Sequence, residues 1–240
     1  MALLITFLSS CRATGQVVET GIEVMARNNF DLLQGKRVGL VTNPTGVDRN
    51  LRSTVDIINS APGVKLTALY GPEHGVRGEF PAGEYVESET DQSTGLPVYS
   101  LYGKTRKPSP EMLNNIDILV YDIQDIGSRS YTFISTLGLL MEAAAEKGIP
   151  VVVLDRPNPL GGIKMEGVVT RPGFFSFVSQ FAIPYIHGMT VGELAMFLNG
   201  EGMLANGIRC DLHVVKMNGW SRKMMFEETG LHWIPSSPHV

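Results

Sequence analysis

The chain has only two cysteines, Cys11 and Cys210, in its 240 residues. Two cysteines exclude a disulfide framework and a zinc site built from cysteines. No apolar run reaches the roughly 18 residues of a membrane-spanning helix, so we expect no membrane span. Lysine and arginine are scattered rather than clustered, and the formal net charge is −4. That charge pattern argues against a nucleic-acid partner, because phosphate binding needs a clustered positive face.

Three motifs that mark other chemistries are also missing. The first predicted strand is followed by Asn-Pro-Thr-Gly rather than Gly-x-Gly-x-x-Gly, which disfavours a nicotinamide or flavin cofactor. The phosphate-binding Gly-x-x-x-x-Gly-Lys-Ser/Thr loop is absent, and no Gly-x-Ser-x-Gly elbow supplies a serine nucleophile. The 5 histidines do not stand at ligand spacing. We therefore expect neither a cofactor nor a metal.

Apolar runs alternate with helical patterns along most of the chain, which is 43% hydrophobic and 18% charged. Strands are predicted at 37–42, 64–70, 96–101, 116–121, 150–154 and 208–215. Helices are predicted at 21–33, 55–59, from 109, at 130–147 and at 190–198. Because the strands are continuously apolar, the pattern predicts an α/β fold: a Rossmann-like, mainly parallel sheet with helices on both faces.

Both ends of the chain have features of their own. Residues 1–11 are a short apolar run that closes in Leu-Ser-Ser-Cys, like a bacterial lipoprotein signal with Cys11 as the lipid-attachment residue. An ordinary secretory leader or a chance apolar start is the alternative. We expect a tether at 12–20, a Rossmann-like catalytic domain at 21–200 and the start of a smaller C-terminal domain at 201–240. The last residues are extended and polar, so we expect the natural protein to continue and this chain to be a truncated form.

The pentapeptide at 71–75, Gly-Pro-Glu-His-Gly, is the most informative segment. It directly follows the predicted strand 64–70, and its Gly-Pro turn presents Glu73 beside His74. Glycoside cleavage needs a protonated carboxyl at the leaving oxygen. Packing of Glu73 against Pro72 and Tyr70 would remove water from the carboxyl and favour its uncharged form. Glu73 is therefore a candidate general acid.

Polar residues follow each predicted strand, at the point where the strand ends. The carboxyl ends of parallel strands share one edge of a sheet, so we expect these side chains to line a common crevice. They are Asn43, Glu73, His74, Asp122, Gln124, Asp125, Arg129, Tyr131, Asp155, Asn158 and His187. Asp122 and Asp125 are the candidates for a second catalytic carboxylate, and the sequence leaves open whether the glycosidic configuration is retained or inverted.

Structural roles are the alternative for single members of this set. Asp122 and Asp125 could cap the following helix or pair with Arg129. Asp155 could form an ion pair with the arginine that follows it. His74 could simply hold its loop by hydrogen bonds.

Five segments in this order resemble the exo-β-N-acetylmuramidases, a family of glycoside hydrolases. They are residues 71–75, 96–103, 121–129, 155–162 and 187–194. The resemblance covers the chain from about residue 21 to its end and departs from the family pattern at Ser130 and Phe133. It implies a Rossmann-like domain followed by a smaller one, with the site in the cleft between them. It also implies release of N-acetylmuramic acid from the non-reducing end of peptidoglycan fragments, with Glu73 as general acid.

Our leading hypothesis is therefore an enzyme of the bacterial cell envelope, periplasmic or anchored to the outer membrane only through its N-terminal lipid. Arg129 would meet the lactyl carboxylate of muramic acid, because a guanidinium binds carboxylates through two parallel hydrogen bonds. The remaining polar residues of the set would hydrogen-bond sugar hydroxyls or the acetamido group. The alternative is a non-catalytic envelope lipoprotein that binds peptidoglycan sugars. A third hypothesis is a hydrolase or transferase that acts on another substrate.

Overall fold

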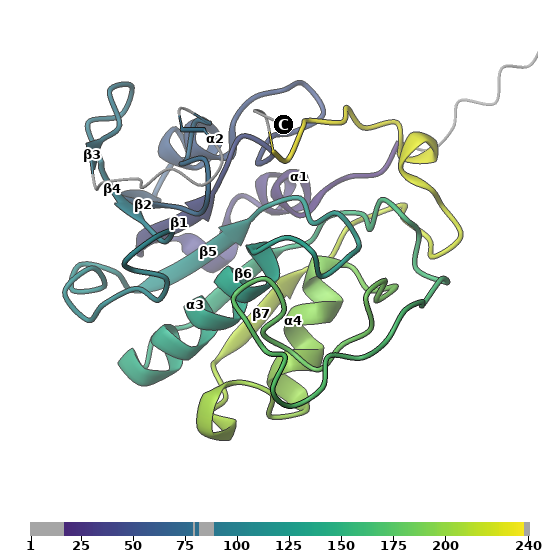
Figure 1. Cartoon of the computed structure of the whole chain (residues 1–240). Coiled ribbons are helices and arrows are strands. Elements are labelled where there is room, and N and C mark those ends of the chain that lie inside the picture. The colour runs from purple at the N-terminus through teal and green to yellow at the C-terminus, as the bar shows by residue number, and fades with distance from the viewer. Residues whose placement is uncertain (1–16, 79, 82–88, 238–240) are drawn as a thin grey trace, which may run out of the picture.

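The structure, a computed structural model, describes residues 17–78, 80–81 and 89–237. Within these residues one sheet has the strand order β3-β4-β2-β1-β5-β6-β7 (Figure 1). The strands are β1 (Arg37–Thr42), β2 (Lys65–Gly71), β3 (Glu89–Thr90), β4 (Pro97–Ser100), β5 (Ile118–Asp122), β6 (Val151–Leu154) and β7 (Leu212–Val215). All neighbours pair in parallel except β3, which runs antiparallel to β4 at the edge. The predicted Rossmann-like, mainly parallel sheet is confirmed.

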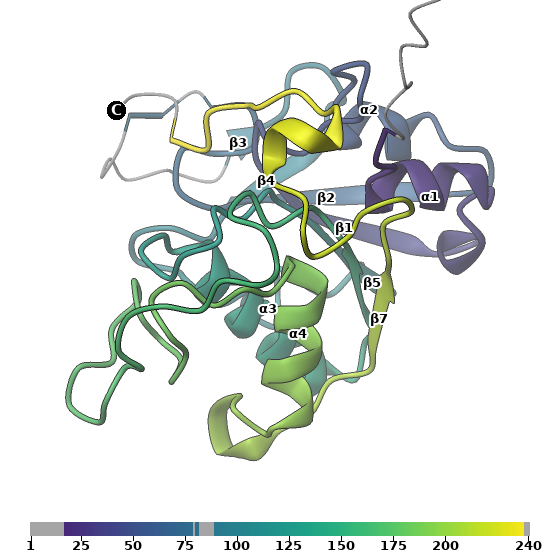
Figure 2. The ribbon, with the colours of Figure 1, turned by 90° about the vertical axis from the view of Figure 1, so that its right-hand side faces the viewer.

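Helices cover both faces of this sheet, as predicted (Figures 1 and 2). The helices are α1 (Gly21–Arg27), α2 (Thr54–Asn59), α3 (Phe133–Lys147) and α4 (Val191–Gly200), with short 3-10 turns at Asp31–Leu33, Ala205–Gly207 and Phe226–Thr229. The first two helices share one hydrophobic core with Leu40 and Val120, and the last two share another with Leu119 and Tyr121. Successive residues of β5 thus enter opposite cores, which explains why the strands are continuously apolar.

Local sequence signals set several helix ends. The Ser53 hydroxyl accepts a hydrogen bond from the Asp56 N–H and so begins α2. Thr190 and Glu193 form a reciprocal capping box at the start of α4, as predicted. Gly148 ends α3 with a φ of 72°, a left-handed conformation that glycine adopts without strain.

Two predicted helices were wrong in part or entirely. The helix predicted at 21–33 ends at Arg27, because Asn29 and Phe30 take left-handed conformations with φ of 54° and 55°. The helix predicted from 109 is a series of turns, in which the Leu113 N–H bonds the oxygen of Pro110 three residues back.

The domain boundary that we predicted at residue 200 falls between two strands of the same sheet. Strand β7 pairs in parallel with β6, so the sheet extends past that boundary. The end of the predicted tether is also part of the fold, since Val18 is fully buried and Glu19 bridges to Asn218. Cys11 and the predicted signal lie outside the described residues. Among the described helices, none has the length and apolar character that crossing a bilayer requires.

Candidate active site

The polar residues that the sequence places in a common crevice lie at or beyond the carboxyl ends of the parallel strands, the edge that we call the rim of the sheet. Most of them have little contact with solvent. The buried ones are Asn43, His74, Asp122, Gln124, Asp125, Asp155, Asn158 and His187. Glu73, Arg129 and Tyr131 are partly exposed. Most of these polar groups bind one another or nearby backbone groups.

Asp122 forms a buried ion pair with Arg156. The Arg156 Nε lies 2.5 Å from Asp122 Oδ1, and its Nη2 lies 2.9 Å from Oδ2. Thr54 donates a further hydrogen bond to Oδ2, and Asp122 has no exposed surface. Arg156 therefore pairs with Asp122 and not, as the structural alternative had it, with Asp155. Because Asp122 is fully buried and both of its oxygens bind the protein, its carboxylate is closed to a substrate or a catalytic water in this structure.

Asp155 holds the start of α4. Its carboxylate accepts hydrogen bonds from the Gly192 N–H at 2.8 Å, the Thr190 hydroxyl at 3.0 Å and the Arg156 N–H at 3.0 Å. Burial raises the pKa of the Asp155 carboxyl to about 6, against the opposing effect of these hydrogen bonds. This carboxylate is a structural anchor between β6 and α4.

Asp125 and His187 form a second buried pair. The His187 Nε2 lies 3.1 Å from Asp125 Oδ2, and the Met189 N–H donates to His187 Nδ1 at 3.3 Å. Because Nδ1 accepts, Nε2 carries the proton and donates to Asp125. Gly127 N–H also donates to Oδ2, whereas Asp125 Oδ1 has no hydrogen-bond partner in the described part of the chain. Of the two predicted second carboxylates, Asp125 is the one with an oxygen that no described group hydrogen-bonds, and that oxygen is buried.

The three amide side chains hold neighbouring loops. Asn43 Oδ1 accepts from the N–H and hydroxyl of Thr45. Gln124 Nε2 donates to the carbonyls of Asp125 and Pro157. The remaining amide, Asn158, donates to the Met189 carbonyl and accepts from the Leu160 N–H. These contacts build the rim, and a sugar would have to displace them.

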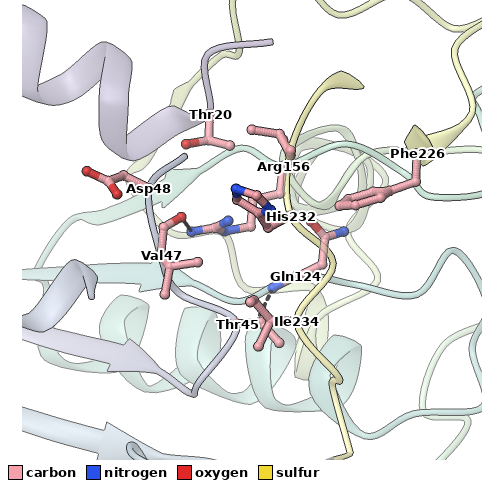
Figure 3. Close-up of a pocket in the computed structure, with 10 residues that line it drawn as sticks. Thr20, Thr45, Val47, Asp48, Gln124, Arg156, Phe226, His232 and Ile234 are labelled. Atoms are coloured by element: carbon pink, nitrogen blue, oxygen red, sulfur yellow. Dashed lines mark hydrogen bonds between the residues drawn. The ribbon is translucent and has the colours of Figure 1, made fainter. Parts of the chain in front are cut away.

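The strand order reverses between β1 and β5, where open α/β sheets usually bind their ligands. Here the Arg156 side chain crosses that point to reach the Val47 carbonyl (Figure 3). Phe226, His232 and Ile234 of the C-terminal segment line the same space. The cavity left is about 20 Å³, which suits a single water and is too small for a sugar.

Glu73 stands where β2 and β4 end side by side. Gly71 pairs with Ser100 in the sheet, so the residues that follow each of them are neighbours. Tyr102 hydrogen-bonds Glu73, and burial together with this carboxylate raises the pKa of the Tyr102 phenol. The Glu73 carboxylate is thus held at the rim, partly exposed, by a group from the adjacent strand end.

His74 fixes the turn that carries Glu73. Its φ of 73° is left-handed, and its ring is buried. His74 Nδ1 lies 3.0 Å from the Phe80 carbonyl, and Nε2 lies 3.0 Å from the Ser237 hydroxyl. The imidazole therefore holds its own loop and ties the C-terminal segment to it.

Two aromatic residues near Glu73, Tyr102 and Phe177, were missed by sequence reasoning; we call them the aromatic wall. The Tyr102 and Phe177 ring centroids are 6.5 Å apart, and the Arg106 guanidinium carbon lies 4.4 Å from the Phe177 centroid. Tyr102 directly follows the predicted strand 96–101, just as Glu73 follows shortly after 64–70, and that signal could have identified it. Nothing in the sequence indicates Phe177, which comes from a distant loop.

Arg129 organises the loop that contains Phe177. Its Nε donates to the Ser179 hydroxyl at 2.9 Å, and its Nη1 donates to the Val168 carbonyl at 2.7 Å. The guanidinium carbon also lies 5.5 Å from the centre of the Tyr185 ring. Two of its three nitrogens are thus bound within the protein.

The groups near Glu73 suit acid chemistry on a ring-shaped ligand. A partly exposed carboxyl can pass a proton, and the rings of Tyr102 and Phe177 offer apolar surface beside it. In the part of the chain that the structure describes, no three His, Cys, Asp or Glu side chains come together as a metal site would require.

The fold defines a Rossmann-like α/β protein. Its partly exposed acid, Glu73, lies at the ends of β2 and β4 and not between β1 and β5, where such sheets usually bind their ligands. Residues 38–240 match the family model described as exo-β-N-acetylmuramidase NamZ, N-terminal, and the chain belongs to that family. The family resemblance of the five segments is thereby confirmed.

Individual relatives agree with this assignment. The chain is 54% identical over 223 residues to peptidoglycan β-N-acetylmuramidase NamZ of Bacillus subtilis (strain 168), covering 93% of this chain and 53% of the relative. A DUF1343 family protein of Bacteroides fragilis has a crystal structure with a TM-score of 0.87 at 65% identity, covering 92% of this chain and 56% of that one. A second such protein gives 0.76 at 35% identity, with 87% and 54% covered. The chain thus spans about half the length of these relatives.

Proposed function

We propose that this chain carries the catalytic acid of a glycosidase that releases N-acetylmuramic acid from the non-reducing end of peptidoglycan fragments. The observation that carries the proposal is Glu73, a partly exposed carboxyl on the rim, bonded to Tyr102 beside an aromatic wall. The name of the Bacillus subtilis relative, a peptidoglycan β-N-acetylmuramidase, supports the reaction and its substrate class.

In this mechanism the Glu73 carboxyl passes its proton to the glycosidic oxygen as the bond between that oxygen and the anomeric carbon breaks. Positive charge develops on the sugar ring, and a water finally supplies the hydroxyl of the released sugar. Asp125 is our candidate for the second carboxylate, because its Oδ1 has no hydrogen-bond partner among the described residues. We leave Asp122 out of the chemistry, since Arg156 and Thr54 occupy its oxygens.

We also propose that the protein works in the cell envelope, attached through a lipid on Cys11. The support is the Leu-Ser-Ser-Cys ending of its apolar start. Metabolic labelling with a radioactive fatty acid tests this, with Cys11→Ser as the control that should remain unlabelled. Equal labelling of both proteins would contradict it.

The test of the catalytic proposal is Glu73→Gln, assayed with a chromogenic muramide in the longest natural form of the protein. General acids typically contribute about 100- to 10,000-fold, so we expect a loss of that size in kcat. Glu111→Gln, which changes an exposed carboxyl elsewhere, should keep full activity. Near-normal release of muramic acid by Glu73→Gln would refute the assignment. Saturable sugar binding without any turnover by the unaltered protein would favour a binding lipoprotein instead.

A further inference from the structure

We propose that Arg106 recognises the carboxylate of the muramoyl group and thereby sets the preference of the site for muramic acid over glucosamine. Muramic acid is a glucosamine that carries a lactyl ether, and this ether ends in a carboxylate. A cation near the catalytic acid would favour this sugar over an uncharged glucosamine derivative, because hydrogen bonds between charged groups are the strong ones. This inference rests on the proposed function, because it assumes that Glu73 acts on a muramoyl sugar.

Arg106 is connected to Glu73 through two aromatic rings. Tyr102 hydrogen-bonds the Glu73 carboxylate, and the Tyr102 ring lies 6.5 Å from that of Phe177. The Arg106 guanidinium carbon is held 4.4 Å from the centre of the Phe177 ring. The charge of Arg106 also lowers the pKa of the Tyr102 phenol, against the larger effects of burial and Glu73, so the guanidinium lies near the phenol that hydrogen-bonds Glu73.

The Arg106 side chain is available to a ligand. It is exposed, and no acidic group in the described part of the chain lies within ion-pair distance of it. A guanidinium that rests over an aromatic face keeps its in-plane N–H groups for other partners. Those N–H groups match the two oxygens of a carboxylate. The contact with Phe177 thus orients the cation without using up its donors.

Other arginines of the rim have partners inside the protein. Arg156 pairs with Asp122, and Arg77 pairs with Asp91. Arg129, to which the sequence assigned the lactyl carboxylate, donates instead to Ser179 and Val168. We therefore transfer that role from Arg129 to Arg106.

The test compares three chromogens: a muramide, a glucosaminide and a muramide whose carboxylate is blocked as a methyl amide. Loss of one charge-assisted pair should lower kcat/KM for the free muramide about 10- to 100-fold in Arg106→Gln, mainly through KM. Activity on the glucosaminide and the blocked muramide should not change. Arg106→Lys should fall between, because it keeps the charge and loses the two-pronged geometry. Arg171→Gln, an exposed arginine on the loop of Phe177, is the matched control and should match the unaltered protein.

The outcomes separate this inference from the function on which it rests. If Arg106→Gln keeps the normal ratio of muramide to glucosaminide turnover while Glu73→Gln is inactive, the role of Arg106 is wrong and the proposed function stands. If the unaltered protein releases no muramic acid, the proposed function falls and takes this inference with it. Because Arg106 is exposed, thermal melting of Arg106→Gln should match that of the unaltered protein, and this measurement excludes loss of folding as the cause.

Discussion

Substitution of Asp122 by alanine tests whether this residue builds the fold. The change removes both acceptors of the Arg156 guanidinium, which is only 5% exposed. Arg156 would keep its bond to the Val47 carbonyl, but its charge would stay buried without a counter-ion. Breaking a buried ion pair in this way costs about 3–5 kcal/mol of unfolding free energy. Urea denaturation followed by circular dichroism measures that loss as a lower midpoint.

A double-mutant cycle provides the control. Asp122→Ala combined with Arg156→Met should destabilise by less than the sum of the single changes, because no unpaired charge is left buried. The exposed pair between Lys164 and Glu166 gives the reference, and Glu166→Ala should cost about 0–1 kcal/mol. A loss below about 1 kcal/mol for Asp122→Ala, or strict additivity in the cycle, would refute a structural role for this carboxylate.

Two further predictions concern the rim. Gly71→Ala would place a Cβ 3.0 Å from the Gly75 Cα, so it should distort the Glu73 turn and destabilise the protein by about 1–3 kcal/mol. In the control variant Gly200→Ala the new Cβ meets nothing within 4 Å, so its stability should be close to that of the unaltered protein. Equal melting temperatures for the two variants would contradict this prediction. The pKa of the Asp155 carboxyl rises from 3.8 to about 6 on folding, so between those pH values the folded protein binds more protons than the unfolded chain. The free energy of unfolding should therefore fall by up to about 3 kcal/mol as the pH increases from 4 to 6. Asp155→Asn should remove that part of the pH dependence, and identical pH–stability curves for both proteins would show that the carboxyl does not titrate in this way.

The fold was largely predictable because its signals are local. Continuous apolar runs identified each long strand, and the Thr190 capping box identified the start of α4. Where the signal was weaker, the prediction failed, as with the helix from 109, which has a favourable start but no amphipathic stretch after it.

The sequence indicated that these polar residues lie along one edge of the sheet, but it did not indicate which of them are exposed. Any polar residue after a parallel strand arrives at that rim, whichever partner it meets there. Asp122 and Asp125 look equivalent in the sequence, yet Arg156 occupies both oxygens of one, while the other keeps an oxygen without a partner among the described residues.

The sequence alone determined the parallel sheet, its two covered faces and the position of Glu73 at a strand end. These features depend on hydrophobic periodicity and turn residues, which are signals between residues close together in the chain. The tertiary structure decided which polar groups pair with each other, how the C-terminal segment narrows the usual crevice, and which aromatic rings stand beside Glu73. Those outcomes depend on contacts between residues far apart in the chain, such as Tyr102 with Phe177, and no local pattern encodes them.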